Sequence, residues 1–127
     1  WGRVDANGKP RTLHINEAIE ATNWKAETLG MQIPIPMTAA NPANVRERIL
    51  RSDFFTMERL TLNGAETVVP NGNSFRAIFV SSGEAEISWE GGALTVPHGR
   101  SCLVPANMQP YSIKPRGDSA TLLLTEV

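Results

Sequence analysis

The sequence is poor in the residues that most often supply cross-links or metal ligands. It contains one cysteine, Cys102, and two histidines, His14 and His98, among 127 residues. A lone cysteine forms no internal disulfide, which suits a reducing compartment. No apolar run approaches the roughly 20 residues that span a bilayer, and the first residues lack the basic-then-apolar pattern of an export signal. We therefore expect a soluble cytoplasmic protein without membrane contacts.

Neither sign of charge predominates. Twelve Lys and Arg residues against thirteen Asp and Glu residues leave a formal net charge of −1. A nucleic-acid binder usually has a strongly basic total or face, so nucleic acid is not an expected partner. The length suits one domain with a single core, and 41% hydrophobic and 20% charged residues are ordinary for a globular protein.

The first part of the chain, residues 1–42, is polar and irregular with one helical signal. In "HINEAIEATNW" the apolar residues Ile15, Ala18 and Ile19 recur at helical spacing, and Asn16 can cap the start. Such a short helix needs a surface to lie on. The following "MQIPIPMTAANPAN" contains three prolines, which disfavour a helix or a central strand. We interpret residues 1–42 as a connector with a short helix, its Pro-rich part extended over the next domain.

Residues 43–127 have the texture of β-structure. Asp53 marks a break between two strands, "SFRAIFVSS" is a strand ending at Gly83, and "EAEISWEGGALTV" is a hairpin. In that hairpin Gly91 and Gly92 can supply the positive φ angles of a tight turn. Many short strands with frequent turns indicate an all-β sandwich or barrel.

Residues 83–113, "GEAEISWEGGALTVPHGRSCLVPANMQPYSI", resemble the cupin jelly roll. The Pro-x-Gly step at 97–99 and the Pro-Ala step at 105–106 match its second motif. Metal-binding cupins place a His-x-His pair and a Glu on the first motif and a His on the second, which suit a divalent ion. Here Asn71, Asn73 and Ser74 surround the first place, and Tyr111 stands near the last. The resemblance therefore implies a metal-free barrel.

The remaining reactive side chains have ordinary explanations. We expect His98 to lie in an exposed turn, His14 to make a local hydrogen bond or a packing contact, and Cys102 to be a buried structural thiol. Four arginines are predicted to form a solvated strand face paired with Glu47 and Glu58 rather than a phosphate site: Arg46, Arg48, Arg51 and Arg59.

The opening "WGRVDANGKPRTLHINEAIEA" resembles the middle of short bacterial, zinc-dependent mannose-6-phosphate isomerases of type I. The residues that carry this resemblance are Trp1, Arg3, Asp5, Gly8, Lys9, Pro10, Arg11, Leu13, His14, Glu17, Ala18 and Ile19. Later segments, including "NSFRAIFVSSGEAEI" and the final "ATLLLTEV", resemble the carboxy-terminal cupin of the same family. The resemblance covers essentially the whole chain.

This resemblance implies a non-catalytic half. The family's zinc is held by Gln, Glu and two His residues ahead of this segment, so no cofactor is expected here, although zinc is expected in the intact parent. There it would act as a Lewis acid while mannose 6-phosphate and fructose 6-phosphate interconvert. Arg3 and Asp5 would be the residues nearest that site, if they are not merely a salt-bridged connector. The implied partner is the amino-terminal catalytic half, whose absence would leave an apolar patch and promote self-association.

Two alternatives remain open at this point. The chain can be a stand-alone, metal-free cupin that binds a sugar or sugar phosphate in a barrel pocket formed by Asn73, Arg76, Gln109 and Tyr111. A weaker hypothesis is a small metal enzyme that uses His14 and His98 with carboxylates brought together by the fold.

Overall fold

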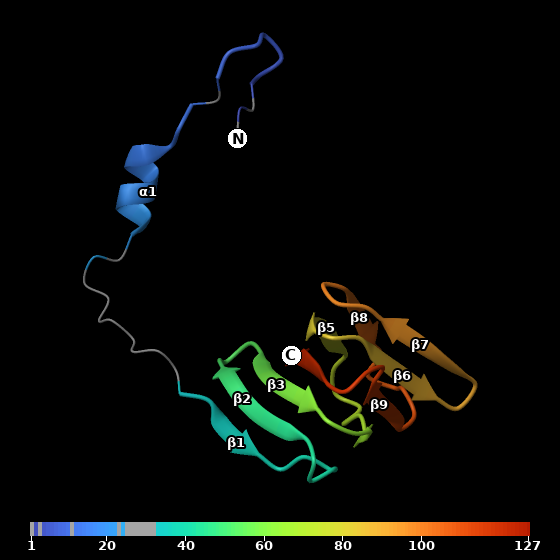
Figure 1. The fold of residues 1–127 in the computed structure, drawn as a ribbon. Helices are drawn as coiled ribbons and strands as arrows, with labels where there is room; N and C mark the ends of the chain where they lie inside the picture. Colours follow the sequence, from blue (N-terminus) through green and yellow to red (C-terminus); the bar gives the residue numbers. More distant parts are fainter. Residues whose placement is uncertain (1, 3, 11, 23, 25–32) are drawn as a thin grey trace. The chain divides into compact units, whose positions relative to one another are not determined.

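The computed structural model describes residues 2, 4–10, 12–22, 24 and 33–127. The chain divides into two compact units, Trp1–Met31 and Gln32–Val127, and each is considered by itself. The first unit contains one helix, and the second contains all the named strands (Figure 1).

The first unit contains a tight turn and the short helix α1, Ile15–Ala21. Val4 and Pro10 form an antiparallel bridge across the turn. The predicted helix is thus present, but its predicted cap is wrong. Asn16 lies inside α1, and the N-cap is His14, which makes no side-chain capping bond. The helix buries none of its residues within the described part of the chain.

The second unit is a sandwich of two antiparallel sheets, as expected for an all-β jelly roll. The larger sheet has the strand order β1-β2-β3-β10-β5-β8 and the smaller one β4-β9-β6-β7. The strands are β1 (Ile35–Met37), β2 (Val45–Arg51), β3 (Thr56–Leu62), β4 (Glu66–Val68), β5 (Arg76–Ser82), β6 (Ala85–Trp89), β7 (Gly92–Val96), β8 (Ser101–Val104), β9 (Tyr111–Pro115) and β10 (Ala120–Glu126).

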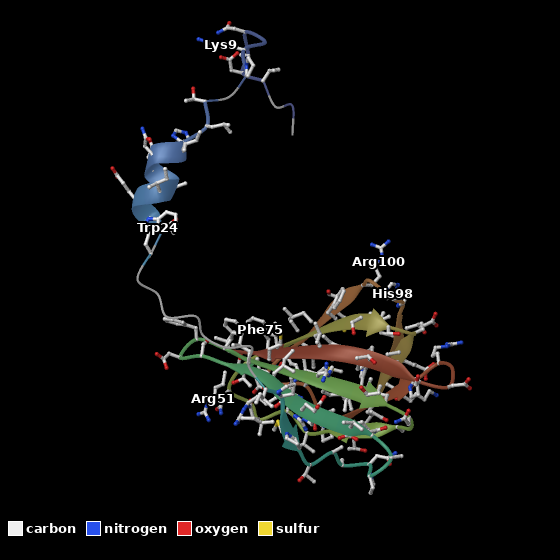
Figure 2. All side chains as sticks on the ribbon, turned by 60° about the vertical axis from the view of Figure 1, so that its left-hand side comes forward. Lys9, Trp24, Arg51, Phe75, His98 and Arg100 are labelled. Carbon is white, nitrogen blue, oxygen red and sulfur yellow. The ribbon has the colours of Figure 1, made fainter. Side chains whose placement is uncertain are left out.

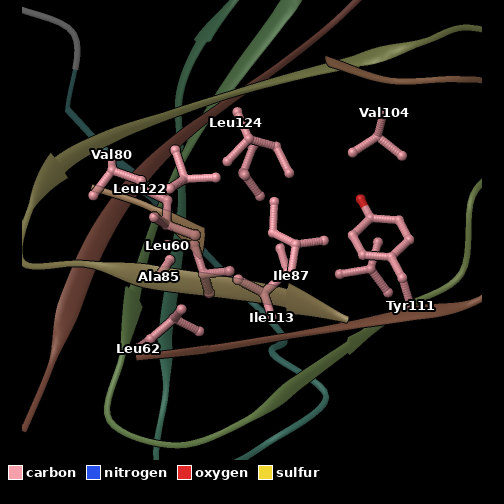
Figure 3. Packing of buried hydrophobic residues seen from close by; sticks show 13 residues of the cluster. Leu60, Leu62, Val80, Ala85, Ile87, Val104, Tyr111, Ile113, Leu122 and Leu124 are labelled. Carbon is pink, nitrogen blue, oxygen red and sulfur yellow. The ribbon is translucent and has the colours of Figure 1, made fainter. Parts of the chain in front are cut away.

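Alternating residues of the two sheets fill the space between them. Leu60, Ile78 and Leu122 come from the larger sheet, Ile87 and Ile113 from the smaller, and each is at most 2% exposed. Figure 3 shows how this cluster packs. Inward-facing apolar residues alternate with outward-facing residues along each strand, and this alternation allowed the strands to be predicted from the sequence.

The Pro-rich segment is extended, as expected, and one detail of the predicted turns needs correction. The Pro-rich segment supplies β1, which pairs with β2 at the edge of the larger sheet, a position that tolerates Pro36. In the hairpin, Trp89 pairs with Gly92, so the turn residues are Glu90 and Gly91. Only Gly91 has a positive φ, of 96°, while Gly92 is the first residue of β7. The predicted break at Asp53 is confirmed by the turn between β2 and β3.

Candidate functional site at the mouth of the barrel

Side chains from both sheets meet around a small cavity at one end of the core. Arg76 of β5 donates from Nη2 to Oε2 of Glu126 on β10 at 2.6 Å. Tyr111 of β9 is 3% exposed, and its hydroxyl has no hydrogen-bond partner among the described residues. The Tyr111 ring lies beside Val104 (Figure 3). All four line a cavity of about 10 Å³, which is roughly the space that one water needs.

Burial and charge act against each other on Arg76 and Tyr111. Burial works to lower the pKa of Arg76, but the bond to Glu126 and the negative charge beside it outweigh this, and the pKa lies above its ordinary value. Burial raises the pKa of Tyr111, and the positive charge of Arg76 opposes only part of that rise. Near neutral pH the site therefore combines a fixed cation with a neutral phenol.

The structure brings together only part of the pocket predicted from the sequence. Arg76 and Tyr111 line the small cavity, whereas Asn73 and Gln109 are exposed and lie outside its lining. Asn71 takes part instead, because its Nδ2 donates to Oε1 of Glu126. Its Oδ1 accepts the Asn73 N–H at 2.8 Å, so Asn73 shapes the loop through its backbone.

A larger pocket opens on the other side of the Arg76–Glu126 pair. It has a volume of about 370 Å³, within the roughly 300–1,000 Å³ typical of small-molecule sites. The turn between β2 and β3 forms one wall, and the ends of β3, β5 and β10 form the floor. Its lining residues are Arg51, Ser52, Asp53, Phe54, Phe55, Thr56, Glu58, Arg76, Leu124, Glu126 and Val127. Sequence reasoning missed this pocket, because no motif marks it.

Two of the four arginines form the predicted pairs with Glu47 and Glu58, but the prediction of a single solvated strand face is wrong. Arg46 binds Glu58 and Arg59 binds Glu47, each at 2.7 Å. The pairs lie on opposite faces of the larger sheet, since the register places Arg46 opposite Leu60 and Glu47 opposite Arg59. Arg48 is half-buried and Arg51 lies exposed at the pocket rim (Figure 2).

The other predicted side chains are dispersed. His98 lies in an exposed turn beside Arg100 (Figure 2), as predicted, and Nδ1 of the exposed His14 lies 3.5 Å from Oε1 of Glu17, which is a local charge contact. Cys102 is partly rather than fully buried; it packs against the core, and burial raises the pKa of its thiol.

The predicted substrate-proximal pair falls only partly within the described residues. Asp5 accepts the N–H groups of Asn7 and Lys9 on Oδ1, both at 2.9 Å, and thereby holds the first turn. Arg3 lies outside the described residues.

A second polar cluster, which was also not predicted from the sequence, surrounds Glu66 at the start of β4. Glu66 is 1% exposed and accepts hydrogen bonds from the N–H groups of Ala40 and Asn41 and from Nδ2 of Asn44. Burial acts to raise the pKa of Glu66, but these bonds outweigh it and the pKa lies below its ordinary value. Asn44 Oδ1 in turn accepts the N–H groups of Asn63 and Gly64. The cluster ties the loop before β2 to the turn after β3.

No group of three or more His, Cys, Asp or Glu side chains in the described parts of the chain is placed to hold a metal ion. At the barrel mouth the central charged group is the guanidinium of Arg76, already bound to Glu126. The positive charge of this guanidinium repels a divalent metal ion. Amide and phenol oxygens are also weaker zinc ligands than imidazole or thiolate.

A match to a protein family shows which family this chain belongs to. The family described as "Mannose-6-phosphate isomerase, cupin domain" matches residues 46–122. The chain belongs to this family. The matched range runs from β2 into β10 and therefore contains most of the mannose-6-phosphate isomerase cupin fold seen here. No curated protein matches the sequence.

Solved structures show the same fold. The mannose 6-phosphate isomerase from Bacillus subtilis superposes with a TM-score of 0.76 at 21% identity, over 100% of this chain and 38% of that one. FeII HppE gives 0.65 at 15% identity, over 80% of this chain and 62% of that one. The Schizosaccharomyces pombe Cnp3 cupin domain gives 0.58 at 15% identity, over 72% and 68%. This mannose-6-phosphate isomerase cupin thus spans well under half of the Bacillus protein's length.

Within the described residues of this mannose-6-phosphate isomerase cupin, no helix has the length and apolar character required to span a bilayer.

Proposed function

We propose that this chain is the metal-free, non-catalytic cupin module of a mannose-6-phosphate isomerase-like protein. The activity of that protein would be the interconversion of mannose 6-phosphate and fructose 6-phosphate, and zinc would be held by residues outside this chain. The family match and the fold support the assignment to this kind of module.

The proposal that the module is non-catalytic rests on the ion pair at the barrel mouth. Arg76 and Glu126 have side-chain exposures of 15% and 23%, and the pair occupies the end of the barrel together with the buried Tyr111 hydroxyl. Binding a divalent ion there would require breaking this pair and leaving a buried guanidinium next to the metal, which is strongly unfavourable. The module is then suited to structural support rather than to Lewis-acid chemistry.

Turnover of mannose 6-phosphate by the 127-residue chain, with and without added zinc, tests this proposal. We expect no turnover in either condition and no stoichiometric zinc by elemental analysis after purification without chelator. Zinc-dependent turnover that disappears in Arg76→Met or Tyr111→Phe would show that the barrel mouth is catalytic and would refute the proposal. A matched control is Arg59→Met, which removes a partly exposed ion pair on the outer sheet face.

The proposed partner is the amino-terminal catalytic half of the parent protein, docked on the outer face of the larger sheet. Phe79 and Leu103 are 37% and 61% exposed there. Leu123 pairs with Phe79, and Ala77 with Leu103, so the four side chains share one face that points away from the core. An apolar face of this kind is typical of interfaces.

If this outer face is left uncovered, the chain should self-associate through it. Sedimentation velocity over a concentration series is expected to show reversible oligomers that Leu103→Asp removes. Val69→Asp is the control, because Val69 is 70% exposed but lies outside the larger sheet. A wild-type chain that stays monomeric at high concentration would contradict the docking face.

We also propose a cytoplasmic location, because the single thiol of Cys102 is partly buried and forms no internal disulfide.

A further inference from the structure

The larger pocket at the barrel mouth has an exposed aromatic side chain at its rim. Phe54 is 80% exposed and lies in the turn between β2 and β3. The hydroxyl of Ser52 accepts the N–H groups of Phe54 and Phe55 at 3.2 and 3.1 Å, and the Ser52 N–H donates to the Phe55 carbonyl at 3.0 Å. The turn is thus organised by its own hydrogen bonds, and it presents a large apolar ring to solvent beside a cavity.

The floor of the pocket offers hydrogen-bonding capacity that the protein does not use. Glu58 accepts both bonds from Arg46 on Oε2, at 2.9 and 2.7 Å, and Oε1 accepts none from the described residues. Arg76 donates to Glu126 through Nη2 alone among the described residues. A guanidinium has five donors and a carboxylate two acceptor oxygens, so both can still bind a ligand.

The charges around the pocket are balanced. Two positive side chains, Arg51 and Arg76, line it together with three negative ones, Asp53, Glu58 and Glu126, and Arg46 outside the lining pairs with Glu58, so positive charge does not predominate. Such a lining gives no net attraction for phosphate or another anion. It favours a neutral ligand whose groups both donate and accept hydrogen bonds.

We propose that this pocket binds an uncharged, polyhydroxylated ligand of the carbohydrate class. Sugar hydroxyls can donate to Glu58 and accept from Arg76, while the C–H face of the ring packs on Phe54. The volume of about 370 Å³ accommodates a small molecule of this kind. The inference concerns binding alone and does not depend on whether the parent protein is an isomerase.

Titration of the ¹⁵N-labelled chain with D-mannose, D-glucose or N-acetyl-D-glucosamine tests this site, with inorganic phosphate titrated in parallel. We expect saturable shifts of the backbone signals of residues 51–56 with at least one sugar and none with phosphate. Phe54→Ala should weaken that affinity by about three- to tenfold, the usual size of an aromatic contact. Phe75→Ala is the matched control, because Phe75 is 42% exposed but does not line the pocket, and it should leave the affinity unchanged.

Each contrary outcome overturns the assignment. No saturable shift with any of the three sugars would refute carbohydrate binding. Saturation by phosphate at the same residues would make this an anion site, and equal effects of the two Phe variants would place the ligand elsewhere. The turnover assay is unaffected by any of these results, so failure of this site and failure of the proposed non-catalytic role are distinguishable.

Discussion

Asn44 bridges Glu66 and the turn after β3 by using both ends of its side-chain amide. Its Nδ2 donates to Glu66 Oε2 at 2.9 Å, while its Oδ1 accepts the N–H groups of Asn63 and Gly64 at 2.8 and 3.0 Å. A buried carboxylate is tolerated here because three donors surround it. The loop that leads into β2 is consequently fixed by a polar cluster instead of by apolar packing.

Glu66→Gln should destabilise the domain by about 2–3 kcal/mol, because it replaces a charge-assisted acceptor with an amide whose NH₂ faces other donors. Urea unfolding followed by fluorescence measures the change. The control is Glu47→Gln on the outer sheet face, for which we expect at most about 1 kcal/mol because its ion pair with Arg59 is partly open to solvent, and ion pairs near the surface contribute little. Equal losses in the two variants would mean that the charge of Glu66 in this cluster contributes no more to stability than the ion pair on the outer face.

The lowered pKa of Glu66 predicts loss of stability in acid. Its ordinary value is 4.5, and the folded-state pKa lies below this. The stabilising contribution is therefore complete above pH 4.5 and is lost as the pH falls through the lower folded-state pKa. Unfolding free energies measured from pH 6 down to about pH 3 should decline less steeply in Glu66→Gln than in the wild type. Some decline of the unfolding free energy should remain in the variant, because the pKa of Glu86 is also lowered, chiefly by Lys114. Equal declines in the variant and the wild type would contradict the role assigned to Glu66.

Gly83 should be far less replaceable than Gly91, although both have positive φ angles of 72° and 96°. A Cβ at Gly83 would lie 2.5 Å from the Ser119 carbonyl oxygen, whereas a Cβ at Gly91 meets nothing within 4 Å. Gly91→Ala should cost about 1–2 kcal/mol from the left-handed backbone alone. Gly83→Ala should cost at least about 2 kcal/mol more because the backbone must also move. Chemical denaturation of both variants tests this, and similar values would show that the β5–β6 turn relaxes freely.

Tyr111→Phe should change stability by less than about 1 kcal/mol, because it removes a hydroxyl that has no partner among the described residues. Tyr111→Ala, in contrast, should cost about 3–5 kcal/mol through the cavity that it leaves. The two unfolding free energies separate the role of the ring from that of the hydroxyl. A loss of 2 kcal/mol or more in Tyr111→Phe would show that the hydroxyl does have a partner, either Arg76 or a water in the small cavity.

The barrel was predictable because its signals are local. Alternation in segments such as 85–89 gives the inner and outer faces directly, and Gly83 and Gly91 mark turns that need a positive φ. The limits of this reasoning appear at the helix start, where Asn16 is a good capping residue in principle but α1 begins one residue before it.

The sites were harder to predict because their partners are remote in sequence. Arg76 and Glu126 are 50 residues apart, and Glu66 lies 22 to 26 residues from its donors. One local signal was available: Glu66 and Val68 are two residues apart on β4, so alternation places Glu66 on the inner face. The pocket beside Phe54 had no such signal, because its lining comes from four strands and a turn that are brought together only in the folded chain.

The position of β10 has a consequence for how the protein is made. β10 pairs with β3 on one side and with β5 on the other, yet it follows both of them and every other strand in the chain. While the ribosome is still producing the residues before Ala120, the inner edges of β3 and β5 have no neighbour, and the larger sheet exists only as two separate parts. The larger sheet can therefore assemble only after β10 has been synthesised. Until then, the open edges of β3 and β5 can be bound by a chaperone or by another nascent chain.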